Sequence, residues 1–417
     1  MPPEPSRRPG VVADRTVDAT LAPPPVPGRL VVATLLAAST LTIMAAAVIS
    51  PSLPQLGAAL GAGPDADVLV RLALTITSLG IAVTALVVGT VSDRVGAVPV
   101  LVGGLVVYAV AGVAGAFVPS LTWLLVTRVL LGVGVAGVMT SVSTIITQAF
   151  RGERRSRLIG LQQTFASLGG VVFLPLAGWL STLAWNAPFW IYAAGALVLP
   201  LALLAFPPAR WTRPAAPPTA PSGDGRAAGR RTGARVALVY VVAALGTLVF
   251  FMAPTQLPFL LTDRGVPATT IGVVVAASTA SGALSATLFS RVRARLDQVG
   301  VTTLSLVLLG VGWLVVGTVP TTAGAVAGVL VGGLGVGLVV PNLNLWVADL
   351  VPPARRGRAL GGLVSAIFLG QFLSPVLLVP MISALGAART FAALGAGLAV
   401  LTLAGHGAFR LTRARAS

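Results

Sequence analysis

A short pattern of arginines and glycines occurs twice in this chain, with its two copies 201 positions apart. The first copy is Arg154-Arg155-Ser156-Arg157, followed by Gly160 and Gly169. The second copy is Arg355-Arg356-Gly357-Arg358, followed by Gly361 and Gly370. Each arginine cluster leads directly into a long apolar segment. The pattern therefore predicts a duplicated membrane protein, in which the same loop and the same helix occur in both halves.

The composition is that of a chain embedded in a membrane. Charged residues make up only 9% of the sequence, whereas 56% of the residues are hydrophobic and the mean hydropathy is +0.94. An ordinary soluble domain has roughly 25% charged residues. There is no cysteine, which excludes disulfides and thiolate metal sites. All 28 basic residues are arginines, which excludes a Gly-Lys-Ser/Thr phosphate loop and therefore nucleotide-driven pumping within this chain.

Apolar runs of about 20 residues, long enough to cross a bilayer as helices, divide the chain into two sets of six. We expect spans near 30–50, 68–91, 97–118, 121–146, 157–182, 187–206, 236–256, 268–290, 299–319, 322–347, 358–384 and 388–409. The sequence thus predicts an all-α membrane protein with an N-terminal bundle at 30–206 and a C-terminal bundle at 236–409. The Pro-, Ala-, Gly- and Arg-rich segment 207–235 is expected to be a linker, and 1–29 and 410–417 to be tails.

Arginines are distributed very unequally among the predicted loops. If the N-terminus is inside, 24 of them lie in cytoplasmic segments, and only Arg71, Arg264 and Arg389 lie near the outer face. The positive-inside rule then places the linker and both termini in the cytoplasm, and the protein in the inner or plasma membrane of the cell. The net charge of +17 reflects this topology and contact with anionic lipid headgroups. Because the arginines are scattered among loops, we do not expect nucleic-acid binding.

The loop between the second and third spans carries a motif, Gly89-Thr90-Val91-Ser92-Asp93-Arg94-Val95-Gly96. Together with the duplicated halves and the long linker, this loop resembles the major facilitator superfamily, and the resemblance covers nearly the whole chain. It implies twelve transmembrane helices in two pseudo-symmetric bundles, and a monomer. It also implies a gating role for Gly89, Asp93, Arg94 and Gly96, in which Asp93 faces the positive N-terminal end of span eleven. The alternative is that Asp93 and Arg94 only solvate the loop.

The fourth span contains an arginine within its apolar sequence. Arg128, followed four residues later by Gly132, resembles a second motif of the family, found in proton-coupled members. The resemblance implies that Arg128 couples transport to protons. A charge inside a membrane is costly, and the matching position in the second half is Val329. The alternative is that the long side chain of Arg128 only reaches toward the outer interface.

The fifth span partly resembles the glycine-rich motif that marks antiporters in this superfamily. The matching residues are Gly160, Gly169, Pro175 and Gly178. Small residues at such spacing let helices pack closely and slide past one another, and close packing alone is the alternative explanation. We assign the same conformational role to Gly132, Gly361 and Gly370.

Polar side chains within the spans are the candidates for a substrate cavity, which the resemblance places between spans one, four, seven and ten. They are Thr40, Thr42, Gln163, Tyr240, Gln256, Asn342, Asn344 and Gln371. Each has the alternative role of hydrogen bonding between helices. Because the set is neutral, we expect a moderately lipophilic or weakly polar organic solute.

Other residues carry less information about function. Asp67 and Arg71 are expected to form a helix cap with an ion pair, and His406 is treated as incidental. No set of residues suggests an enzyme, a metal or another cofactor. The resulting hypothesis is secondary active transport by alternating access, foremost proton-coupled efflux of drug-like compounds. Solute uptake or facilitated diffusion is the second reading, and a non-transporting membrane sensor the third.

Overall fold

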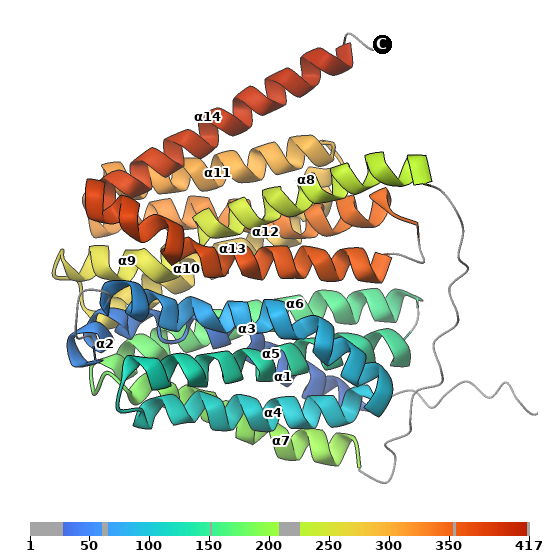
Figure 1. Ribbon diagram of the computed structural model, residues 1–417, viewed down its shortest axis with the longest axis vertical. Coiled ribbons are helices and arrows are strands. Elements are labelled where there is room, and N and C mark those ends of the chain that lie inside the picture. The colour runs from blue at the N-terminus through green and yellow to red at the C-terminus, as the bar shows by residue number, and fades with distance from the viewer. Residues whose placement is uncertain (1–27, 61–65, 151, 208–225, 353–355, 415–417) are drawn as a thin grey trace, which may run out of the picture.

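The computed structural model describes residues 28–60, 66–150, 152–207, 226–352 and 356–414. Within these ranges every regular element is a helix. The long helices lie side by side in two bundles, which follow one another along the chain (Figure 1). The first bundle runs from blue to green in this view, and the second from yellow-green to red.

The first bundle contains six helices that run back and forth through it. They are α1 (Arg29–Ala47), α3 (Ala66–Val95), α4 (Ala97–Ala114), α5 (Leu121–Ala149), α6 (Gly152–Ser181) and α7 (Ala194–Ala205). The connections contain the short helices η1 (Ser50–Ser52), α2 (Leu53–Leu60), η2 (Gly115–Phe117) and η3 (Ala187–Ala193). The core is made of small and branched apolar residues together with the fully buried Tyr108, Arg128, Phe189 and Tyr192.

The second bundle repeats this plan with one broken helix. α8 (Arg226–Phe250) is interrupted at Phe251 and continues as α9 (Met252–Thr262). Pro254 and Pro258 follow the break, and a proline removes a backbone donor from a helix. The remaining helices are α10 (Ala268–Arg293), α11 (Gln298–Thr318), α12 (Thr322–Leu350), α13 (Arg356–Leu385) and α14 (Ala387–Ala414).

The predicted spans correspond closely to these helices. Eleven helical segments of the described chain are long and apolar enough to cross a membrane, and α1 adds a shorter apolar stretch, Arg29–Thr42. α1 packs against α5, α6 and α7 as a full member of the first bundle. The predicted all-α membrane fold with two six-helix bundles is therefore confirmed.

Two boundaries differ from the sequence-based expectation. α8 begins at Arg226, so helix occupies the last part of the segment 207–235 that we expected to be a flexible linker. Alanine and arginine favour helix, which allows α8 to extend beyond its apolar run. The sixth span begins as the 3-10 helix η3, with Pro188 in its first turn, before it becomes α7.

The bundles have two ends, which we name by their connections. The linker face carries the end of α7, the start of α8 and the turn at Gly96 between α3 and α4, whereas the opposite face carries α2 and the turns at Gly265 and Gly386. Most arginines of the described segments lie at the linker face. The exceptions, toward the opposite face, are Arg71, Arg128, Arg264 and Arg389.

Close helix packing repeats between the bundles at the same offset of 201 residues. In the first bundle, Gly132 of α5 lies against the Thr77 carbonyl of α3 with no room for a Cβ atom. In the second bundle, Gly333 of α12 lies against the Ser278 carbonyl of α10 in the same way. A second repeated pair joins α5 to α4 and α12 to α11 (Gly134 with Gly104, Gly335 with Ser305). The duplication therefore extends from the sequence pattern to the individual helix contacts.

Candidate functional site: the interface between the bundles

Near the opposite face, the two bundles are joined by an arginine of α3. The Arg71 Nε donates a hydrogen bond to Gln256 Oε1 of α9 at 2.8 Å, and its guanidinium carbon lies 4.1 Å from the centre of the Phe259 ring. Arg71 is only 7% exposed. We call Arg71, Gln256 and Phe259 the latch. It ties the first bundle to the second at the opposite face, and the Ser50 hydroxyl adds a hydrogen bond to the Pro254 carbonyl nearby.

At mid-depth, α3 meets α13 and α6 meets α10. The Ser78 hydroxyl of α3 donates to Gln371 Oε1 of α13 at 2.8 Å. Somewhat closer to the linker face, the Ser365 hydroxyl donates to the Ala82 carbonyl at 3.4 Å. The two bundles are thus connected through neutral polar side chains, and the predicted cavity residues Gln256 and Gln371 both lie at this interface.

The close approach of α6 and α10 depends on two glycines. A Cβ atom on Gly178 would lie 2.6 Å from the Ala268 carbonyl oxygen, and one on Gly272 would lie 2.5 Å from the Leu174 carbonyl oxygen. Pro175 of α6 follows Leu174 directly and removes one donor from the helix ladder at this crossing. These contacts lie toward the opposite face, on the same side as the latch.

The predicted packing glycines between mid-depth and the linker face differ in how closely a neighbouring helix approaches them. Gly169 and Gly370 lie against the carbonyls of Thr40 in α1 and Ala244 in α8, where any side chain would collide. In contrast, Gly160 and Gly361 have no atom within 4 Å of where a Cβ would stand, and the same is true of Gly89, for which we expected a gating role. The helices therefore cross tightly at mid-depth and have open space around these glycines closer to the linker face.

Arg128 of α5 is enclosed by carbonyls and aromatic rings within the first bundle. It is 0% exposed, and its Nη2 donates to the carbonyls of Ala111 and Gly112 at 3.0 and 2.9 Å, near the C-terminal end of α4. The guanidinium carbon lies 4.9 and 5.0 Å from the ring centres of Phe189 and Tyr192. Nη1 makes no hydrogen bond. A cation at a helix C-terminus between aromatic faces is electrostatically favoured, so this environment holds a charged arginine without exposing it.

The motif loop between α3 and α4 is a turn of one residue. Gly96 adopts φ 98°, a conformation that other residues rarely adopt, and Arg94 is exposed. The backbone of Asp93 lies in the last turn of α3 at the linker face, while its side chain lies outside the described part of the structure. The backbone conformation therefore explains why a glycine stands at position 96. The gating role of Asp93 and Arg94 stays a prediction.

The other predicted cavity residues are mostly satisfied within their own bundle. Thr40 and Thr42 donate to carbonyls of their own helix, and Asn344 donates to the Val340 carbonyl. Asn342 of α12 donates to the Gln298 carbonyl and to Thr302 of α11, so it joins two helices of the second bundle. Tyr240 donates to the Ala359 carbonyl of α13, and Gln163 is exposed. The structure does not bring these six residues together.

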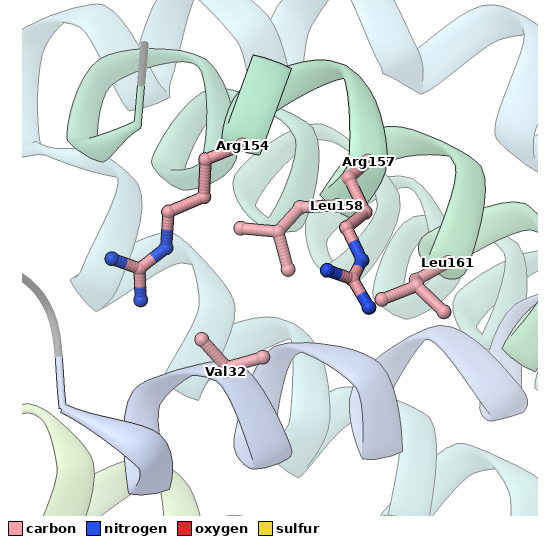
Figure 2. A pocket seen from close by; sticks show the side chains of 5 residues that line it. All are labelled: Val32, Arg154, Arg157, Leu158 and Leu161. Atoms are coloured by element: carbon pink, nitrogen blue, oxygen red, sulfur yellow. The ribbon is translucent and has the colours of Figure 1, made fainter. Parts of the chain in front are cut away.

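At the linker face, a cavity of about 470 Å³ opens between α1 and α6. Figure 2 shows Arg154, Arg157, Leu158 and Leu161 of α6 pointing toward Val32 of α1 across this space. We call it the wedge. Sequence reasoning recognised the arginine cluster as a topology signal but did not identify a cavity there.

The latch was also missed by sequence reasoning, which expected Arg71 only to form a cap and ion pair with Asp67. The sequence did contain a signal. Like Arg128, Arg71 lies close to an apolar span, and it is one of the few arginines that the predicted topology places near the outer face. Its partners lie 185 residues away in Gln256 and further still in Phe259, so only the packed structure identifies them.

Comparison with known proteins identifies the family of the chain. Residues 35–375 and 236–416 match the family model of the Major Facilitator Superfamily. The chain belongs to this superfamily. It is a multi-pass membrane protein of a family of transporters rather than enzymes, and two of the three relatives described below are named as transporters.

Three relatives illustrate the range of related proteins. The 3-(3-hydroxy-phenyl)propionate transporter of Escherichia coli (strain K12) is 25% identical over 332 residues, covering 78% of this chain and 81% of that protein. The niacin transporter NiaP of Acinetobacter baylyi is 33% identical over 113 residues, covering 25% of this chain and only 26% of that protein. The methyl viologen resistance protein SmvA of Salmonella typhimurium is 31% identical over 157 residues, covering 37% of this chain and 31% of that protein.

A solved structure shows the same fold. The crystal structure of a POT family transporter in complex with 5-aminolevulinic acid superposes with a TM-score of 0.72 at 13% identity, covering 89% of this chain and 94% of that chain. The likeness extends over both bundles, which agrees with the superfamily match over most of the sequence.

Proposed function

We propose that this chain moves a small organic solute across the membrane by alternating access, with the two bundles rocking about their interface. The observation that carries this proposal is the asymmetry of the interface. Hydrogen bonds join the bundles from the opposite face to mid-depth, whereas glycines nearer the linker face have open space around them. This difference fits a carrier whose bundles are held together at one end and can separate at the other to admit the solute.

In this proposal the linker face is cytoplasmic, and the protein resides in the cell membrane with its termini inside. The unequal distribution of arginines supports this orientation. The conformation of the structure then corresponds to a carrier closed toward the outside. The latch at Arg71 and Gln256 would stabilise this state, and the loop with Asp93 and Arg94 would act at the other end.

For the substrate, we propose a small organic acid with a mostly apolar body. Arg71 at the interface and Arg128 within the first bundle are buried arginines of the described spans, and the hydrogen bond that joins the bundles at mid-depth is between the neutral side chains of Ser78 and Gln371. Such surroundings repel a cation and tolerate a neutral or singly negative solute. Relatives named for niacin and for 3-(3-hydroxy-phenyl)propionate transport support the same class.

Efflux of lipophilic compounds is the second candidate. The neutral character of Ser78 and Gln371 at mid-depth suits a weakly polar drug-like molecule, and one relative is named for methyl viologen resistance. The two candidates differ in the charge of the solute and in the direction of net movement, so one experiment separates them.

Proton coupling through Arg128 belongs to the proposal as well. Arg128 is fully buried, and its Nη1 makes no hydrogen bond in this conformation. Coupling would require that rocking of the bundles changes the surroundings of this guanidinium. The proton gradient would supply the driving force, whose electrical part is worth about 2.3 kcal/mol per charge per 100 mV.

The function is tested by reconstituting the full chain into liposomes with an imposed pH gradient. Labelled nicotinate and 3-phenylpropionate represent the organic acids, and ethidium represents lipophilic cations. We expect gradient-dependent flux of the acids and none of the cation. Flux of ethidium alone would support efflux instead. A folded protein that carries none of the three would contradict both candidates.

The latch is tested through accessibility. Because the chain contains no cysteine, a single Thr255→Cys substitution beside the latch reports access from the opposite face. Hydrogen bonds to charged groups contribute about 1.5–3 kcal/mol, so Arg71→Gln should raise labelling by a membrane-impermeant maleimide about tenfold or more. Arg389→Gln, at an exposed arginine of the same face, serves as the matched control. Equal labelling in both variants would rule out a gating role for Arg71.

A further inference from the structure

We propose that the wedge between α1 and α6 binds the headgroup of an anionic phospholipid. Its phosphate would lie between Arg154 and Arg157, and the start of its acyl chains would contact Val32, Leu158 and Leu161. This binding site is independent of the solute that the protein carries.

The shape of the wedge follows from the way the two helices cross. α1 and α6 touch at Gly169 and Thr40, where the backbones approach too closely for any side chain. From this crossing the helices extend toward the linker face, where a cavity of about 470 Å³ lies between them (Figure 2). The cavity therefore lies between this tight crossing and the linker face.

The charges of the wedge fit a phosphodiester. Arg154 and Arg157 lie three residues apart on the same side of α6, in the first two turns of a helix of 30 residues. Neither guanidinium has a hydrogen-bond or ion-pair partner among the described residues, although Arg154 stacks 5.2 Å from the centre of the Phe150 ring. Arginine binds phosphate oxygens through paired N–H groups, and the helix N-terminus adds a positive potential.

The depth of the wedge matches the headgroup region of a bilayer. The membrane-spanning part of α6 begins at Arg157, and α1 begins at Arg29, three residues before Val32. The guanidiniums therefore lie where the helices leave the hydrocarbon region, while the leucines and the valine lie just inside it. Basic pockets between transmembrane helices at this level are suited to anionic headgroups.

The second bundle closes the equivalent space with its own side chain. Tyr240 of α8 lies four residues before the helix crossing at Ala244, and its hydroxyl donates to the Ala359 carbonyl of α13. Gly362, the counterpart of Leu161, leaves room for this ring. In the first bundle the residue four before Thr40 is Leu36, which has no hydroxyl to reach across. Among the described residues, the second bundle therefore has a tyrosine between these two helices where the first bundle has a leucine.

The test measures lipid retention by native mass spectrometry of the full chain, offered phosphatidylglycerol and phosphatidylcholine together. We expect the wild type to retain phosphatidylglycerol. The variant Arg154→Gln/Arg157→Gln should retain it about tenfold less, because two of its charge contacts are lost. The matched control is Arg235→Gln/Arg410→Gln, which removes two exposed arginines elsewhere on the linker face.

A second variant tests the cavity rather than the charge. Val32→Trp fills the wedge and keeps both arginines, so it should also lose phosphatidylglycerol. The proposal is overturned if the control pair loses as much lipid as Arg154→Gln/Arg157→Gln, because binding would then be general surface attraction. Full retention in Val32→Trp overturns it as well. Displacement of the lipid by millimolar inorganic phosphate or nicotinate would show that the wedge takes free anions instead.

Discussion

Near the opposite face, the two bundles fill equivalent sites with different side chains. In the first bundle, the guanidinium of Arg128 lies against the carbonyls of Ala111 and Gly112 and the ring of Tyr192. In the second bundle, the residues at the matching positions of Gly112 and Arg128 are Trp313 and Val329, and both are fully buried. Trp313 fills its site with a neutral indole that packs edge-on against Phe391 at 5.5 Å.

Each site also forms a hydrogen bond to the first helix of its own bundle. The Tyr192 hydroxyl donates to the Ala45 carbonyl of α1 at 2.9 Å, and the Trp313 indole N–H donates to the Val249 carbonyl of α8 at 2.7 Å. The second bundle achieves this without any charge. Packing alone therefore does not require Arg128, and a buried charge that packing does not require is a candidate for function.

The largest expected effect comes from Arg128→Met. Methionine fills much of the same volume but leaves the Ala111 and Gly112 carbonyls without this donor, at a cost of about 1–3 kcal/mol, so the protein should stay folded with a somewhat lower unfolding temperature. Gradient-driven flux should nevertheless fall by roughly tenfold or more, the scale of one lost charge interaction. Flux in liposomes and thermal unfolding are measured on the same preparation. Wild-type flux in Arg128→Met would contradict this prediction. The charge of Arg128 would then be dispensable for transport as well as for packing.

The second prediction concerns the tight helix crossing that occurs in both bundles. Gly169→Ala and Gly370→Ala place a Cβ against a backbone carbonyl, so each should cost about 1–3 kcal/mol of stability, as overpacking does. Gly160→Ala and Gly361→Ala, which have open space, are the matched controls and should unfold at the wild-type temperature. Thermal unfolding in detergent measures all four. A clear difference between Gly169→Ala and Gly370→Ala would show that the two crossings are not equivalent.

The third prediction compares the matching turns at the linker face. Gly96→Ala forces φ 98° on a residue with a Cβ and should cost about 1–3 kcal/mol. Its counterpart Asp297 instead caps α11 by accepting a hydrogen bond from the Gly300 N–H at 2.8 Å, so Asp297→Ala should cost about 1 kcal/mol. Chemical or thermal unfolding ranks the two variants. The reverse order would mean that the turn in the first bundle relaxes more easily than its geometry indicates.

The smallest effects on transport are expected from Tyr192→Phe and Trp313→Phe, which remove the two equivalent donors. Each loses one buried hydrogen bond, worth about 1 kcal/mol, and Trp313→Phe also leaves a small cavity. Both should transport normally, since neither alters a charge. If Tyr192→Phe lowered flux while Trp313→Phe did not, the functional region around Arg128 would have to include Tyr192.

Much of the architecture was determined by the sequence alone. The lengths of the apolar runs located the helices from α3 to α14 to within a few residues at most ends, because crossing a bilayer requires a fixed helix length. The 201-residue offset indicated two halves with the same helices, and it recurs in the contacts of Gly132 with Thr77 and of Gly333 with Ser278. These properties are local or periodic, so they can be identified without knowing how the helices pack.

The tertiary structure decided which side chains meet. Gln256 and Gln371 lie at the interface between the bundles, whereas Thr40 and Asn344, which are also neutral and polar, bond within their own helices. Gly169 is packed and Gly160 is open, although both belong to one sequence motif. Such differences depend on the rotation and crossing point of each helix relative to its neighbours. Those quantities arise from the packing of the whole bundle, and no single segment of sequence specifies them.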